Sequence, residues 1–144
     1  MNTAASPTDV RKLQEVLSNH LYTLNQVYEL KRRLRNCREL SEESRRLLDR
    51  PLERIEEHLS GSLYLPEGPP NGCGLIIDDP QGESYDECRT DLEAEFVGEG
   101  DGPLMVVEVV RPVIRLVVQG QTWVVQRGRI VVALKAEQEK GAAS

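Results

Sequence analysis

The chain has 144 residues, of which 39% are hydrophobic and 29% charged, and its formal net charge is −6 at pH 7. This composition is typical of one small globular domain, or of a helical segment followed by one, and excludes the strongly basic class of nucleic-acid-binding proteins. No apolar run is long enough to cross a membrane, and three widely spaced cysteines fit neither a disulfide framework nor a CxxC site. We therefore expect a reduced, cytoplasmic protein that binds no membrane and no nucleic acid.

After a tail at 1–6, residues 7–60 are predicted to form a helical dimerisation segment. Ser6-Pro7-Thr8-Asp9 is a helix start signal, because a serine caps free amides and a proline suits the first helical position. Apolar residues then recur at steps of three and four. A helix of about thirty residues is longer than a small domain needs, so we predict that its apolar stripe pairs with a second copy in a homodimer. The predicted interface residues are Leu13, Leu17, His20, Leu24, Val27 and Leu34.

Two interruptions are expected in this segment. Ser41-Glu42-Glu43 predicts a helix end and a restart, and Pro51 predicts a kink or a further restart. The basic run at 31–38 is interpreted as a solvated helix face that pairs with nearby glutamates, although docking to an acidic partner stays open. The second helical stretch has its own apolar face, made of Leu47, Leu48, Leu52, Ile55 and Leu59.

A linker is predicted at 61–73, where three prolines and three glycines occur, and a small β domain at 74–136. The β-branched density after residue 104 favours strands near 74–78, 104–110, 113–118, 121–126 and 129–134. Short turns join the last three strands, so an antiparallel meander is expected, and the acidic stretch 79–103 is expected to be mostly loop. A frayed tail follows at 137–144. The predicted fold class is α+β: a long N-terminal helix with shorter helices, then a small antiparallel β domain.

The residues that could carry chemistry favour no enzyme, metal site or cofactor site. His20 and His58 are the only histidines, and no serine or cysteine has a plausible triad context. The glycines at 98, 100 and 102 alternate with acidic residues that would repel phosphate, so they indicate an acidic hairpin loop. No calcium-loop spacing occurs among the acidic residues. The roles of Cys73 and Cys88 are not indicated.

One surface is a candidate for protein binding. Trp123, the only tryptophan, lies on a predicted strand, and either a core position or an interface anchor fits the alternation of side chains. The segment 112–136 holds basic residues and no acidic residue, whereas 78–101 is acidic. We hypothesise that Arg115, Trp123 and Arg127 form a partner-binding face. The alternative is that Trp123 belongs to the core and the arginines only offset the acidic loop.

The stretch 76–87 contains Pro80, Gly82, Tyr85 and Asp86 at P-x-G-x-x-Y-D spacing after an apolar run. This pattern resembles a motif of the GrpE nucleotide exchange factors. That family carries an apolar strand, then P-x-G-x-x-(F/Y)-D and an acidic loop, and later a V-x-x-V strand and a meander that ends in V-x-V. The resemblance covers mainly 74–134, and the helices match by order and pattern. Thr90-Asp91-Leu92 and Gln126-Arg127-Gly128 depart from the family's H-E-A and R-P-A motifs. The matching residues are Pro80, Gly82, Tyr85, Asp86, Gly102, Val106, Val109, Ile130 and Val132.

The resemblance implies a bacterial, cytoplasmic co-chaperone. Proteins of that family are homodimers through paired long helices, bind the ATPase domain of a DnaK-type chaperone and release ADP without bond chemistry. The mechanism is preferential binding of the open, nucleotide-free ATPase domain. The alternative expectation is a dimeric scaffold or regulatory interaction protein that keeps this architecture without exchange activity.

Overall fold

The computed structural model describes residues 7–61 and 73–138, and within the first helix it describes side chains from residue 15 onward. The chain divides into two compact units. The helical unit consists of Met1–Ile76 together with Leu116–Trp123, and the strand unit consists of Ile77–Arg115 together with Val124–Ser144. The units are not contiguous in sequence, because three strands contribute residues to both of them. The linker predicted at 61–73 lies mostly outside the described residues.

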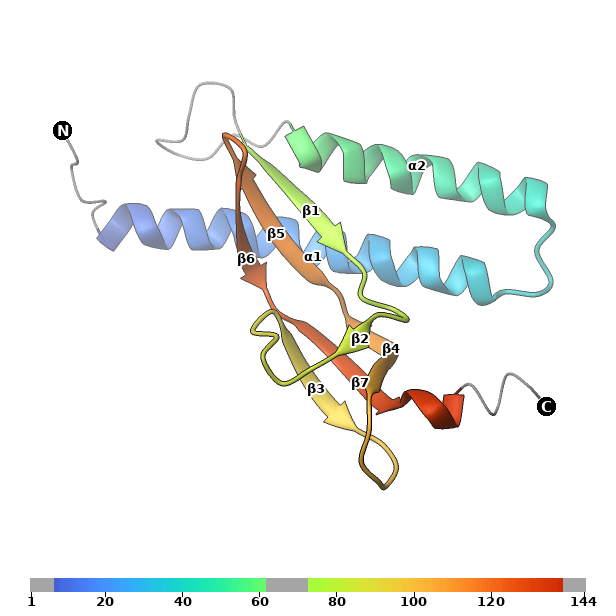
Figure 1. Ribbon diagram of the computed structural model, residues 1–144. Helices are drawn as coiled ribbons and strands as arrows, with labels where there is room; N and C mark the ends of the chain where they lie inside the picture. The colour runs from blue at the N-terminus through green and yellow to red at the C-terminus, as the bar shows by residue number, and fades with distance from the viewer. Residues whose placement is uncertain (1–6, 62–72, 139–144) are drawn as a thin grey trace. The chain divides into compact units, whose positions relative to one another are not determined.

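Two long helices, α1 (Pro7–Asn36) and α2 (Glu42–Gly61), lie side by side in the helical unit (Figure 1). The restart expected at Ser41 is confirmed, because the Ser41 hydroxyl accepts a hydrogen bond from the amide of Ser44 at 3.1 Å. The Arg45 guanidinium donates to the carbonyl oxygens of Leu34 and Cys37, both at 3.1 Å, and so satisfies acceptors at the end of α1. The short connection and these bonds make α1 and α2 a helical hairpin.

The further restart considered at Pro51 is wrong, because α2 continues through this residue. A proline inside a helix leaves the carbonyl four residues earlier without its amide donor. That residue is Leu47, which is 63% exposed, so water reaches the side of the helix on which the unpaired carbonyl lies. The segment therefore keeps one helix of 20 residues instead of two shorter ones.

The α+β class is confirmed, and the described strands form two sheets (Figure 1). The first sheet has the order β1-β5-β6, with β1 at Gly74–Asp78, β5 at Val113–Val118 and β6 at Gln121–Gln126. The second has the order β2-β4-β7-β3, with β2 at Ser84–Tyr85, β3 at Leu92–Phe96, β4 at Leu104–Arg111 and β7 at Gly128–Leu134.

The predicted meander is wrong at its last strand. β7 does not continue from β6 but pairs antiparallel with β4 and parallel with β3, so the sheet is not purely antiparallel. The chain changes sheet at Gly128, where an added Cβ would lie 2.9 Å from side-chain atoms of both Leu92 and Val113. Only glycine fits this approach without displacing its neighbours.

β3 lies in the acidic stretch 79–103, which was expected to be mostly loop, although its residues, Leu-Glu-Ala-Glu-Phe, alternate apolar and acidic side chains. In the structure only Leu92 of this strand is buried, at 2% exposure, and the four that follow are exposed. The pairing with β7 completes the strand that this alternation indicates.

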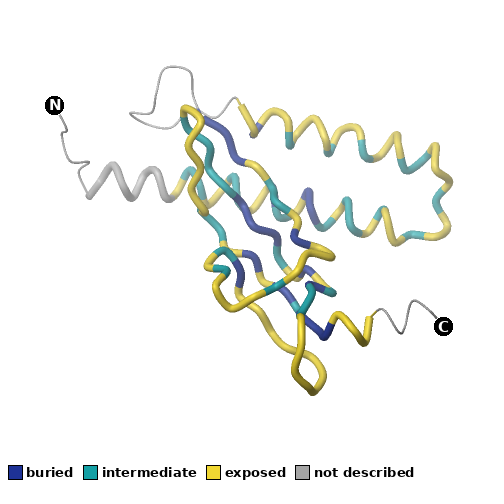
Figure 2. Tube along the Cα trace, viewed as in Figure 1, coloured by how far each residue is buried: buried dark blue, intermediate teal, exposed yellow. Residues whose placement is uncertain are grey.

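Each unit has its own buried apolar residues (Figure 2). The largest of the helical unit come from both helices and from β1: Leu24, Val27, Tyr28, Leu59 and Leu75. Those of the strand unit come mainly from β4, β5 and β7: Val106, Val109, Val113, Ile114, Ile130 and Val132. Burial of such side chains is the main stabilising contribution in both units.

Candidate protein-binding surfaces

Among the side chains that the structure describes, no group of three or more His, Cys, Asp or Glu could hold a metal ion. No helix in the described part of the chain is both long and apolar enough to cross a membrane. The residues that the sequence singled out lie in α1, in α2 and in or next to the strands.

Arg115 of β5 is engaged inside the strand unit. Its guanidinium lies 3.2 Å from the carboxylate of Asp78 and 3.0 Å from that of Asp91. Asp78 ends β1, and Asp91 immediately precedes β3, so one arginine joins three parts of the chain. The geometry gives Arg115 a role within the strand unit, because its Nε and Nη2 groups already donate to acceptors in the same chain.

Asp91 is the centre of a group that we call the Asp91 cluster: Asp78, Glu83, Arg89, Asp91 and Arg115. The Asp91 carboxylate is 14% exposed and accepts from Arg89 at 2.9 Å as well as from Arg115. Hydrogen bonding from Arg89, assisted by the positive charges of Arg89 and Arg115, holds the pKa of Asp91 below its usual range. The same hydrogen bond raises the pKa of Arg89, which also lies 3.1 Å from Glu83.

Arg127 is likewise occupied by its own chain. It donates to the carbonyl oxygens of Thr90 at 3.0 Å and Leu92 at 3.1 Å, and it lies 3.1 Å from the carboxylate of Glu93. These bonds fix the entry of β3 beside the point where the chain enters β7. The arginines thus offset acidic residues, as the alternative interpretation expected.

Trp123 is 49% exposed, so its interpretation as a core residue is wrong. It belongs to the helical unit, whereas Arg115 and Arg127 belong to the strand unit. The structure therefore does not define the three residues as one face. Trp123 keeps the exposure that an interface anchor requires before binding.

The predicted dimer stripe on α1 is partly used within the chain. Leu24 and Val27 are 1% and 3% exposed, so they are not available to a second copy, and their place in the predicted interface is wrong. Leu17, His20 and Leu34 are half-buried, and the side chain of Leu13 lies outside the described residues. The side chains of Leu24 and Val27 are buried in the single chain, which the periodicity of a single helix does not reveal.

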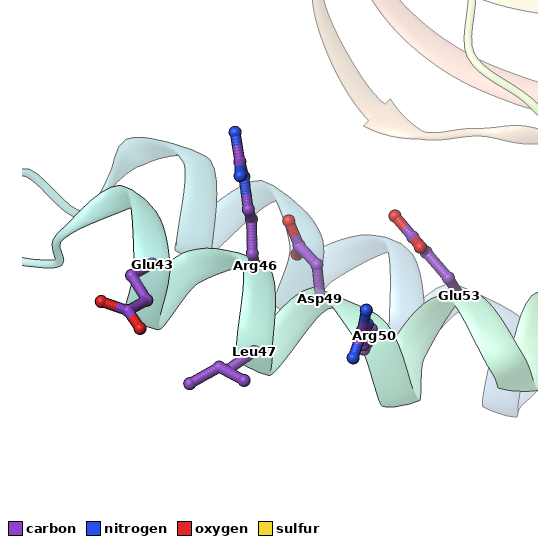
Figure 3. Close-up of a pocket in the computed structure, with 6 residues that line it drawn as sticks. All are labelled: Glu43, Arg46, Leu47, Asp49, Arg50 and Glu53. Atoms are coloured by element: carbon purple, nitrogen blue, oxygen red, sulfur yellow. The ribbon is translucent and has the colours of Figure 1, made fainter.

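The apolar face predicted for α2 is only partly buried. Leu59 is buried and Leu52 is half-buried, whereas Leu47, Leu48 and Ile55 are exposed at 63%, 46% and 37%. A depression of about 360 Å³ lies along this helix and is lined mainly by charged side chains (Figure 3). Its lining residues are Glu43, Arg46, Leu47, Asp49, Arg50 and Glu53.

The residues of the GrpE-like motif build a turn against β4. Pro80 is fully buried, and Gly82 has a φ of 80°, a conformation that favours glycine. The Gly82 amide donates to the carbonyl of Val106 at 3.0 Å. The carboxylate of Asp86 accepts from the amide of Cys88 at 2.7 Å. These contacts make the motif a structural element of the strand unit.

Sequence reasoning missed the Asp91 cluster because Arg115, which joins its acidic members, is 24 residues from Asp91 and 37 from Asp78. The signal that could have found it is the contrast between the acidic segment 61–111 and the basic, acid-free segment 112–136. Opposite charges in two segments of one small domain favour pairing between them. No family model, no curated protein and no solved structure matches the chain.

Proposed function

We propose that the protein is a divergent GrpE-like co-chaperone that binds the ATPase domain of a DnaK-type chaperone and promotes ADP release. The observation that carries the proposal is the P-x-G-x-x-Y-D motif at 80–86, followed by the V-x-x-V pattern of β4. The local structure supports it, because the proline of the motif is buried and its glycine has a positive φ, which favours that residue type. The order of two N-terminal helices and a strand unit agrees with the same family.

The proposed mechanism needs no catalytic residue. A protein that binds the open, nucleotide-free ATPase domain more tightly than the ADP-bound form shifts the population toward the open form. By linkage, ADP weakens the binding of the factor by the same ratio. A coupling of about 1–3 kcal/mol corresponds to a change in ADP affinity of roughly 5- to 150-fold.

Trp123 is the proposed contact with the chaperone. Its ring is half-exposed, and tryptophan is enriched among residues that dominate binding energy. Arg115 and Arg127 support the fold instead of the contact, since their guanidinium groups are bonded within the strand unit. Homodimerisation remains part of the proposal, through surfaces other than Leu24 and Val27.

The alternative function is a dimeric scaffold or regulatory protein without exchange activity. The exposed leucines of α2 favour it, because neighbouring exposed apolar side chains are a common feature of protein–protein contacts. This function predicts binding to a partner without any effect on nucleotide release.

The experiment is ADP release from the DnaK-type chaperone of the same organism, followed with a fluorescent ADP analogue by stopped flow. We expect the full chain to accelerate release. Trp123→Ala should raise the concentration needed for half-maximal acceleration by about 30-fold, the loss typical of an anchor residue. Tyr22→Ala is the matched control, because Tyr22 is an aromatic residue with 69% exposure on α1. Chaperone binding without acceleration would favour the scaffold. If the chain neither binds the chaperone nor accelerates ADP release, the proposal is contradicted.

A further inference from the structure

The edges of the two sheets differ in how they are protected against pairing with another chain. Edge strands of soluble proteins are usually short or carry charged residues or proline. β2 has two residues, β1 ends at Asp78 and is followed by Asp79-Pro80, and β3 carries Glu93 and Glu95. These three edges therefore have the usual protection.

β6, at the other end of the first sheet, has none of these features. Its sequence is Gln-Thr-Trp-Val-Val-Gln, without a charge, a proline or a glycine, and among the described strands only β5 is its neighbour. The residues from Gln121 to Val124 are all exposed, so both faces of this part of the strand are open. Trp123 is 49% exposed and Val124 is 39% exposed. A six-residue segment with these properties has strong β propensity and low charge.

We propose that β6 pairs antiparallel with β6 of a second copy of this chain, which joins two sheets across a two-fold axis. Two equivalent strands related by such an axis must keep side chains of the same residue on the same face of the sheet. Directly opposed residues also share a face, so the numbers of an opposed pair must have the same parity. The two-fold axis must therefore pass through the position of a residue and not between two residues. Trp123 and Val124 are the two residues at the middle of β6.

The register centred on Val124 gives favourable pairs along the whole contact. Val124 lies opposite its own counterpart, Trp123 lies opposite Val125, and Thr122 lies opposite Gln126. An aromatic residue opposite a β-branched one is among the stabilising cross-strand combinations, and no like charges face each other. This self-complementarity is the reason for assigning a second copy as the occupant instead of a foreign peptide.

The charges next to β6 do not oppose the pairing. Arg127 is the first charged residue after the strand, and its guanidinium lies 3.1 Å from the carboxylate of Glu93 in the same chain. The inference does not depend on the proposed exchange function, although pairing would cover Trp123 and so compete with its proposed contact with a chaperone.

The test uses the full chain alone, from about 1 to 200 µM, the range where weak strand pairing is measurable. Sedimentation velocity gives the association state, and acrylamide quenching of fluorescence reports on Trp123, the only tryptophan. We expect quenching to fall as the concentration rises. Quenching that does not change with concentration in the unmodified chain would overturn the proposal.

Charge substitutions at the centre of the register make the test specific to β6. Val124→Lys and Val124→Glu would each place two like charges opposite each other. We expect the protein concentration at which Trp123 becomes protected to rise by about tenfold or more. An equimolar mixture of the two variants should associate again, because opposite charges then face each other. Val110→Lys is the control, since Val110 is 50% exposed on β4, which has neighbours on both sides.

Two outcomes would contradict the pairing. One is a Val124→Lys variant, folded by circular dichroism, in which Trp123 is protected as strongly as in the unmodified chain. The other is a mixture of folded Lys and Glu variants that fails to restore protection. Association that persists in all variants without protection of Trp123 would belong to another surface and would also overturn the assignment.

Discussion

Replacing Asp91 by asparagine tests whether the Asp91 cluster stabilises the strand unit. The substitution keeps the size of the side chain but removes the charge that Arg89 and Arg115 share at 2.9 and 3.0 Å. Hydrogen bonds to charged groups contribute about 1.5–3 kcal/mol each, and partial exposure of both arginines reduces this value. We therefore expect the free energy of unfolding to fall by about 2–3 kcal/mol, including the repulsion between the two guanidinium groups.

The assay is urea denaturation of the full chain, followed by far-ultraviolet circular dichroism at pH 7. Glu93→Gln is the matched control, because Glu93 pairs with Arg127 at 3.1 Å but the two side chains are 44% and 50% exposed. An ion pair with that exposure contributes less than about 1 kcal/mol. Asp91→Asn must therefore cost clearly more than Glu93→Gln, and equal losses would refute the argument that the cluster is stabilising.

The pH dependence gives a second check on Asp91. Its pKa is lower in the folded chain than in the unfolded chain, so the unfolded state binds the proton more readily. The stabilisation is then present above the unfolded pKa, about 3.9, and is lost as the pH falls through the folded pKa. The difference in stability between the unmodified chain and Asp91→Asn should shrink below about pH 4, and a constant difference would contradict the assignment.

Three further substitutions follow from burial and spacing. Gly128→Ala should destabilise the chain by about 1–3 kcal/mol in the same urea assay, because its Cβ would lie 2.9 Å from Leu92 and Val113; an unchanged midpoint would contradict the close packing. Leu24→Ala should cost about 2–5 kcal/mol, since Leu24 is 1% exposed, whereas Leu30→Ala, at 48% exposure on the same helix, should cost under about 1 kcal/mol. Trp123→Ala should change the free energy of unfolding by less than about 1 kcal/mol, and a loss of about 3–5 kcal/mol would return this residue to the core.

The features that were predictable from the sequence are those set by local chemistry. The cap at Ser41 and the strands rich in valine and isoleucine were expected, because capping and β propensity depend on neighbouring residues. The α+β class follows from the same signals. The continuity of α2 through Pro51 was not predictable, since it depends on which side of the helix faces solvent.

The features that were missed depend on distant parts of the chain. β3 has a local signal in its alternating residues, but its partner is the distant strand β7, and the place of β7 depends on the passage at Gly128 between two sheets. The roles of Arg115 and Arg127 depend on acceptors 24 to 37 residues away in the chain. For the candidate site, the sequence left both a core and a surface position open for Trp123. The exposure of its side chain in the structure decides for the surface.

The interleaved division of the chain has a consequence for its synthesis. The helical unit needs Leu116–Trp123 in addition to the first 76 residues, and the strand unit is split in the same way. During translation the helices are made first but must wait, for a time on the order of seconds, until the residues that complete their unit are made. No single peptide-bond cleavage separates the two units into intact fragments. The helical unit is therefore incomplete in the nascent chain until Trp123 has been made.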